Sequence, residues 1–303
     1  MQFGLNTYHI TDRYGWYESG EKNSRSLVYS TKDIIKQGFR HVELLLDVGS
    51  KDTEVLNAEV IERLHEFTVV DHIGFSAHLP YKYVDIGSLN EAIRKTSVEL
   101  ILTAIKIANQ IGIDRLVLHP VGAESKPFDL SFYPASKNVK EKIINEMVDQ
   151  IRLSLREIVG AIDSHRLCLE NLPYIDFDPF IPLIDEFDLG VCMDVGHCIL
   201  RHDDPLEFIA RFSKQLGVVH LHDVADFRTK PGVMKLLDHE PLGTGIVDVK
   251  SILRGLQAID FDGPVVLEHL EESKALQSVA FLKRLIHSDF PELSDFLGDY
   301  KQG

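Results

Sequence analysis

The chain has 303 residues, of which 44% are hydrophobic and 26% are charged, values that are typical of one large globular domain. Its 47 acidic residues outnumber its 32 basic residues, and the formal net charge of −15 argues against duplex DNA as a partner. We expect a cytoplasmic protein without a membrane partner, because no apolar run approaches the roughly 20 residues of a membrane helix and Met1–Gly4 does not begin a leader.

Short apolar or β-branched runs recur along the chain with helical segments between them, which predicts parallel strands joined by helical crossovers. Two of the helices have recognisable starts. A capping box of Ser88 with Glu91 opens Asn90–Asn109, and Asp204 caps Pro205–Lys214, which has its proline in the first turn. The predicted strands are Gln2–Tyr8, His41–Asp47, Gly74–Leu79, Leu116–Pro120, Arg166–Glu170, Leu189–Asp194, Gly217–Leu221 and Pro264–Glu268.

This alternation fits either a closed barrel or an open, doubly wound sheet. No GxGxxG motif follows the first strand, and metal-binding residue types end six of the eight runs. An open sheet would instead gather its ligands near one topological switch point. We therefore predict an α/β protein with a (β/α)₈ TIM barrel as a single domain over residues 1–303. The tail, Pro291–Gly303, is expected either to dock as a short helix or to fray.

Three segments that follow strands are long, namely Tyr8–Ser30, Val121–Lys137 and Asp223–Gly245. In a barrel all three would stand over the same mouth. The first is rich in aromatic residues, which suits either a lid over a ring-bearing substrate or packing of the segment onto the barrel rim. Its candidate substrate-binding residues are Tyr8, His9 and Trp16.

The ends of the last six predicted strands carry imidazole or carboxylate groups. Ionised Glu170, Asp194 and Glu268 at one barrel mouth would repel each other, and such groups either take up protons or gather cations. Mixed imidazole and carboxylate ligands suit Zn²⁺, Mn²⁺ or Fe²⁺ better than Ca²⁺ or Mg²⁺. Any one of these residues has an ordinary structural explanation, but six strand ends in agreement favour a metal site. The strand-end ligand candidates are His78, His119, Glu170, Asp194, His220 and Glu268.

The alternation of residues along the strands supports this assignment. Small or apolar residues precede four of the candidates by two positions, and residues two apart share a face of a strand. Because barrel interiors are mainly apolar, we expect both members of each pair to point inward. The preceding residues are Cys168, Cys192, Val218 and Val266. The three cysteines of the chain form no CxxC pair and are expected to be reduced.

At these residues the sequence resembles the xylose-isomerase-like barrel superfamily, which contains sugar isomerases and epimerases and also endonuclease IV, of AP endonuclease family 2. The likeness to endonuclease IV is closest in Ser76–Gly87 and in Leu118-His119-Pro120. It implies a trinuclear metal site in which His197 and His239 join the six strand-end ligands. The family has an aspartate two positions before the loop histidine, where this chain has Leu237. The adjacent Asp238 is the candidate replacement, and without it the third metal would be weak or absent.

The sugar epimerases of the same superfamily are also similar to this chain, in Lys230–Val233 and in Leu242–Asp248. That resemblance implies a single metal and two glutamates that act as acid and base. The implied ligands are Glu170, Asp194, His220 and Glu268. His78 and His119 would then have no ligand role.

Three functions follow from these resemblances. The first is a metal-dependent hydrolase of a nucleotide-like or cofactor-derived phosphoester. It would use two or three ions of Zn²⁺ or Mn²⁺, with Fe²⁺ as the alternative, and Glu170, Glu268 and His197 as catalytic residues. The second, weighted only slightly lower, is a one-metal isomerase or epimerase of a sugar or sugar phosphate. The third is a barrel that binds metal without turnover. In each case the partner is a small molecule, with His222 and Asp238 as further binding residues. The substrate and the oligomeric state stay open.

Overall fold

The computed structural model describes residues 1–7, 27–46, 56–122, 137–226, 228–230 and 235–296. Within them, parallel strands close into a barrel in the order β1-β10-β7-β6-β5-β4-β3-β2. Because β1 pairs with both β2 and β10, the barrel sheet has no free edge. This confirms the predicted TIM barrel. The strands are β1 (Gln2–Asn6), β2 (His41–Leu45), β3 (Gly74–His78), β4 (Arg115–Leu118), β5 (Leu167–Glu170), β6 (Gly190–Asp194), β7 (Leu216–Leu221) and β10 (Pro264–Leu267).

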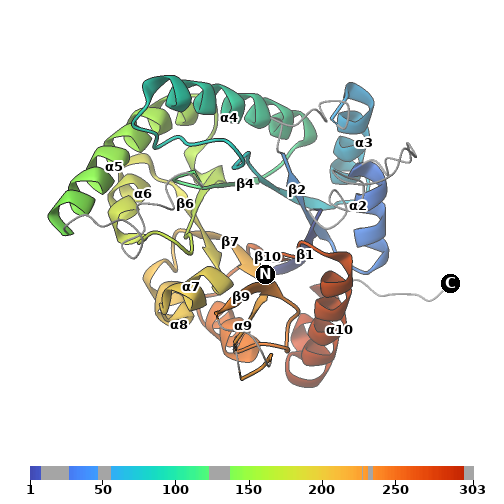
Figure 1. The fold of residues 1–303 in the computed structure, drawn as a ribbon. Coiled ribbons are helices and arrows are strands. Elements are labelled where there is room, and N and C mark those ends of the chain that lie inside the picture. Colours follow the sequence, from blue (N-terminus) through green and yellow to red (C-terminus); the bar gives the residue numbers. More distant parts are fainter. Residues whose placement is uncertain (8–26, 47–55, 123–136, 227, 231–234, 297–303) are drawn as a thin grey trace, which may run out of the picture.

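The helices form a ring around the outside of the barrel (Figure 1). In α9 an apolar stripe faces inward, with Val249, Ile252, Leu253 and Leu256 buried. The helices are α2 (Leu27–Lys36), α3 (Ala58–Val69), α4 (Glu91–Ile111), α5 (Lys137–Val159), α6 (Ile181–Phe187), α7 (Val195–Arg201), α8 (Pro205–Arg211), α9 (Val249–Ala258) and α10 (Glu272–Asp289), and the 3-10 turns are η4 (Ser164–Arg166), η5 (Asp178–Phe180) and η6 (Pro291–Phe296).

The predicted helix starts are half right. Asp204 caps α8 as expected, with its side chain accepting a hydrogen bond from the backbone N–H of Leu206. The capping box of Ser88 is wrong, because Asn90 caps α4 by accepting from the N–H of Ala92. The Ser88 hydroxyl instead accepts from the backbone N–H of Asn90, the residue just before α4 begins.

Two of the predicted long loops contain regular structure. Residues 27–30 of the first already belong to α2, and Asp223–Gly245 contains an antiparallel pair of short strands, β8 (Asp223–Ala225) and β9 (Leu237–Glu240). The buried Asp223 carboxylate holds the segment after β9, because it accepts backbone hydrogen bonds from Gly243, Gly245 and Val247. Tyr8, His9 and Trp16 lie outside the described residues, so the aromatic lid stays a prediction.

The barrel interior contains its own small apolar layer beneath the mouth. Its members are fully buried and form a cluster separate from the larger core between strands and helices. Four of them are the residues expected to point inward, which confirms the predicted alternation. The layer consists of Val117, Cys168, Cys192, Val218 and Val266.

The end of the chain packs on the outer ring as far as it is described. η6 lies against α10, and Leu293 is buried. The expectation that the tail docks or frays stays a prediction. Residues 297–303 lie outside the described part. None of the described helices combines the length and the apolar character needed to cross a membrane.

Candidate metal centre

Four neighbouring strands of the barrel bring one ligand group each to a common point. Glu170 ends β5, Asp194 ends β6, His220 lies near the end of β7, and Glu268 follows β10. One ligand atom from each lies within 4.8 Å of the others. The Nδ1 atom of His220 is 3.1 Å from Oε2 of Glu268 and 3.6 Å from Oε1 of Glu170. The strand-end residues therefore converge as expected from sequence.

Several polar atoms of this group are buried without a hydrogen bond among the described residues. They are Oε2 of Glu170, both ring nitrogens of His220 and Oε2 of Glu268. Buried polar atoms are ordinarily satisfied, and buried carboxylates pair with cations or metals. The donor set, three carboxylates and one imidazole, therefore fits a divalent cation on its own chemistry.

The two glutamates of the group are ionised at neutral pH. Burial by itself raises the pKa of Glu170, but the imidazoles of His119, His220 and His78 outweigh burial and hold this pKa well below its ordinary value. Burial likewise raises the pKa of Glu268, but the imidazole of His220 outweighs burial and holds this pKa well below its ordinary value. The site is thus a concentration of negative charge that imidazoles only partly neutralise.

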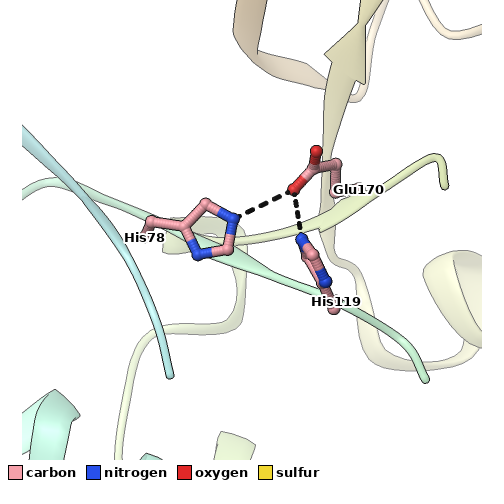
Figure 2. Close-up of side chains that lie close together, drawn as sticks. All are labelled: His78, His119 and Glu170. Carbon is pink, nitrogen blue, oxygen red and sulfur yellow. Dashed lines mark ion pairs between the residues drawn. The ribbon is translucent and has the colours of Figure 1, made fainter. Parts of the chain in front are cut away.

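His78 and His119 contact the other oxygen of Glu170. Figure 2 shows both rings pointing Nε2 at the same carboxylate oxygen, at 3.3 Å for His78 and 3.1 Å for His119. The carbonyl oxygen of Leu79 lies 2.8 Å from Nδ1 of His78, so Nδ1 carries a hydrogen and donates it. A neutral His78 would then set a lone pair against a carboxylate, which calls for a proton or a cation between them. Glu170 therefore lies between two pairs of histidines. Its Oε2 faces His78 and His119, and its Oε1 faces His197 and His220.

A third group lies beside the first, between β7 and β8 and on β9. It contains His222, Asp238 and His239, with their ligand atoms within 4.8 Å of one another. His197, in the first turn of α7, donates from Nδ1 to the carbonyl oxygen of Asn171 and has Nε2 3.7 Å from Oδ2 of Asp238. Asp238 thus faces three histidines, His197, His222 and His239, which supports it as the replacement for the missing loop aspartate. Its metal role stays a prediction.

His222 is fully buried behind the centre. Its Nε2 lies 3.1 Å from both oxygens of Asp194, and its Nδ1 lies 3.2 Å from Oδ1 of Asp238. From this position His222 can hold the carboxylates of Asp194 and Asp238 in place. The sequence had instead suggested that His222 contacts substrate. Asn171 also supports Asp194, because its side chain accepts from the N–H of Asp194 and donates to the carbonyl oxygen of Asp194.

The close approach of His222 requires a glycine in α7. A Cβ atom on Gly196 would lie 1.9 Å from Cε1 of His222. We expect Gly196→Ala to push the ring away from Asp194 and to lower the free energy of unfolding by about 1–3 kcal/mol, as overpacking of a core does. Thermal and denaturant unfolding measure this. Gly160→Ala is the control, since its added Cβ would meet nothing closer than 3.4 Å, and an equal loss in both variants would contradict the prediction.

Cation binding is expected to release protons from histidines. Burial lowers the pKa of His239, but Asp238 and Glu268 outweigh it and raise this pKa well above normal. Burial also lowers the pKa of His78, and Glu170 raises it above its usual value. Because these pKa values are raised, protons on the rings compete with a cation, so affinity falls as pH falls. Calorimetric titration in two buffers of different ionisation enthalpy should show about one proton or more released per ion, and none released would contradict the prediction.

Sequence reasoning missed three buried polar residues of the interior, His41, Glu43 and Ser76. A signal for them exists. His41 and Glu43 alternate with Val42 and Leu44, and Ser76 sits between Phe75 and Ala77. In a parallel barrel, whose strands are covered on both faces, polar residues at alternate positions point to a polar interior.

Known proteins resemble this chain along most of its length. A model of the family described as xylose isomerase-like TIM barrel matches residues 32–285. A ketose 3-epimerase of Arthrobacter globiformis is 23% identical over 268 residues, which cover 86% of this chain and 83% of that protein. An L-ribulose-5-phosphate 3-epimerase, UlaE, of Escherichia coli O157:H7 is 23% identical over 251 residues, 78% of this chain and 79% of its own. The crystal structure of a D-tagatose 3-epimerase-like protein superposes with a TM-score of 0.72 at 22% identity, covering 97% of this chain and 100% of that one.

Proposed function

The chain belongs to the xylose isomerase-like TIM barrel family, and from that premise we propose that it is a metal-dependent isomerase or epimerase of a ketose or ketose phosphate. Two curated relatives are named as 3-epimerases of such small molecules. The sequence alone weighted phosphoester hydrolysis slightly higher, and these relatives reverse that order. Zn²⁺, Mn²⁺ and Fe²⁺ stay the candidate ions.

The observation that carries the proposal is the placement of two ionised glutamates around one cation site. Glu170 and Glu268 come from β5 and the end of β10, with β6 and β7 between them in the barrel. They therefore approach the site from its two sides. Moving a proton off one face of a carbon and onto the other needs two such groups. A divalent cation between them would supply polarisation of the ketose carbonyl and of the hydroxyl next to it.

The residues of the chain divide the remaining tasks. One glutamate removes the proton from the carbon beside the carbonyl, and the other returns a proton to the opposite face. The Glu268 side chain is 15% exposed against 1% for Glu170, so Glu268 is the more accessible to substrate. Beside Glu268 lies a hollow that Asn6, His78 and Tyr81 also line, which offers polar partners for sugar hydroxyls.

Deuterium exchange tests this function directly. Ketopentoses, ketohexoses and their phosphates are incubated in D₂O with protein reconstituted with Mn²⁺, Zn²⁺ or Fe²⁺, and the products are followed by NMR. We expect deuterium at the carbon beside the carbonyl of at least one substrate, together with its epimer or isomer. Protein stripped of metal is the control. Absence of exchange across the panel, with turnover of bis-p-nitrophenyl phosphate instead, would overturn the proposal.

One observation favours the second candidate, hydrolysis of a phosphoester. His78, His119 and Glu170 form a ligand group of their own, whose atoms lie within 4.8 Å of one another. A cation there, bridged by Glu170 to the first, would give a metal pair of the kind that activates water for attack on phosphorus. In the epimerase these two histidines contact substrate hydroxyls instead.

A further inference from the structure

A chain of buried polar side chains runs inside the barrel beneath the candidate centre. It begins at His41 of β2, passes Ser76 of β3 and Glu43 of β2, and ends at His220 of β7. None of the four is more than 4% exposed. Other interior positions, on β4, β5, β6, β7 and β10, are filled by the small apolar layer. The polar chain is thus a local departure from an apolar interior.

The contacts of the chain have a definite direction. Ser76 donates its hydroxyl hydrogen to Oε2 of Glu43 at 2.8 Å. Nε2 of His41 lies 2.9 Å from the same hydroxyl oxygen and must donate to it, because the hydroxyl hydrogen is already used. Oε1 of Glu43 then lies 3.0 Å from Nε2 of His220. Ser76, itself held by His41, thus holds one oxygen of the carboxylate, and His220 faces the other.

Two glycines of the barrel leave space for His41, the first residue of the buried polar chain. Gly4 of β1 and Gly74 of β3 are the register partners of His41 on its two sides. A Cβ on Gly74 would lie 2.7 Å from Nδ1 of His41, and one on Gly4 would lie 3.0 Å from Cδ2. The imidazole therefore occupies space that any larger residue at either glycine would take. This favours a built arrangement over incidental packing.

We propose that Glu43 is a positioning residue for the metal ligand His220. With Oε1 3.0 Å from Nε2 of His220, the Glu43 carboxylate favours a proton on Nε2, which leaves Nδ1, the atom that faces Glu170 and Glu268, free for a cation. A carboxylate behind a ligating histidine orients the ring and makes it a better ligand. Ser76 and His41 keep the carboxylate in place. The inference rests on the cation site of the proposed function, and it does not depend on the substrate.

Binding of Zn²⁺ and Co²⁺ to the full chain without substrate tests the proposal. Affinity is measured by competition with a chelator, and the visible spectrum of bound Co²⁺ reports ligand geometry. Removal of such a supporting carboxylate lowers metal affinity by about 10–100-fold, and we expect this for Glu43→Leu together with a changed Co²⁺ spectrum. Glu43→Gln, whose amide oxygen still accepts a hydrogen bond, should restore most of the loss.

Ser76→Ala and Ser154→Ala provide the matched pair. Both serines are fully buried, but Ser154 of α5 donates to the carbonyl oxygen of Ile86, outside the barrel. We expect Ser76→Ala to weaken Zn²⁺ binding and Ser154→Ala to leave it unchanged, whatever each does to thermal stability. If Glu43→Leu does not fold, Glu43→Gln and Ser76→Ala decide the question.

Unaltered affinity and spectrum in Ser76→Ala and in every folded Glu43 variant would overturn the positioning role. So would a lack of cation binding by the unaltered protein. Failure of the proposed function looks different, because the unaltered protein would bind the cation and the Glu43 variants would weaken it, while no ketose would be turned over.

Discussion

Glu170→Gln is expected to remove bound cation more completely than any other single substitution and to lower turnover by about 10²–10⁴-fold, the range for loss of a general acid or base. Glu170 belongs to three of the four ligand groups in the described residues, and its two oxygens face different histidines. An amide in its place would bring a hydrogen-bond donor and no charge to a position that needs a negative ligand. Elemental analysis after reconstitution, with kinetics on a ketose, measures both losses.

Two further variants sharpen this result. Glu268 belongs to only one of the groups, so Glu268→Gln should reduce turnover comparably while keeping more of the bound cation. Glu186→Gln is the control, because Glu186 pairs with Arg152 on the outer helices and should change neither quantity. Full cation content in Glu170→Gln, measured beside unaltered protein, would be incompatible with Glu170 as the central ligand.

The double substitution His78→Ala with His119→Ala separates the epimerase from the hydrolase. For the epimerase we expect one cation before and after the change, with a loss of substrate hydroxyl contacts of about 1 kcal/mol each. The sum of about 2 kcal/mol corresponds to roughly a 30-fold lower kcat/KM, mainly through KM. Metal stoichiometry and steady-state kinetics on the ketose found by deuterium exchange measure these effects.

A hydrolase would respond in the opposite way. The double variant would lose about one equivalent of cation, and turnover of bis-p-nitrophenyl phosphate, present in the unaltered protein, would collapse. His165→Ala serves as control, because His165 is exposed and pairs with Asp188 far from the mouth. A drop in cation content only in the double variant would therefore favour the metal pair over the single site.

The barrel was predictable because parallel strands that are covered on both faces appear in the sequence as short apolar runs. The ends of each observed barrel strand lie within two residues of the predicted ends. Local chemistry was harder to predict where two residues compete. Ser88 and Asn90 both resemble helix caps, and the observed start of α4 selects Asn90. The region 223–245 lacked long apolar runs, so its pair of short strands was not predicted.

The sequence by itself determined which candidate ligands gather at the mouth, since the carboxyl ends of parallel strands meet there and each of these residue types stands at such an end. Only closure of the barrel decided which of them touch. Glu43 of β2 reaches His220 of β7 across the interior, although the two are not on neighbouring strands. His222 likewise reaches Asp194 only because Gly196 leaves space for its ring. Such contacts depend on side-chain depth and packing across the barrel, which the period of a single strand does not encode.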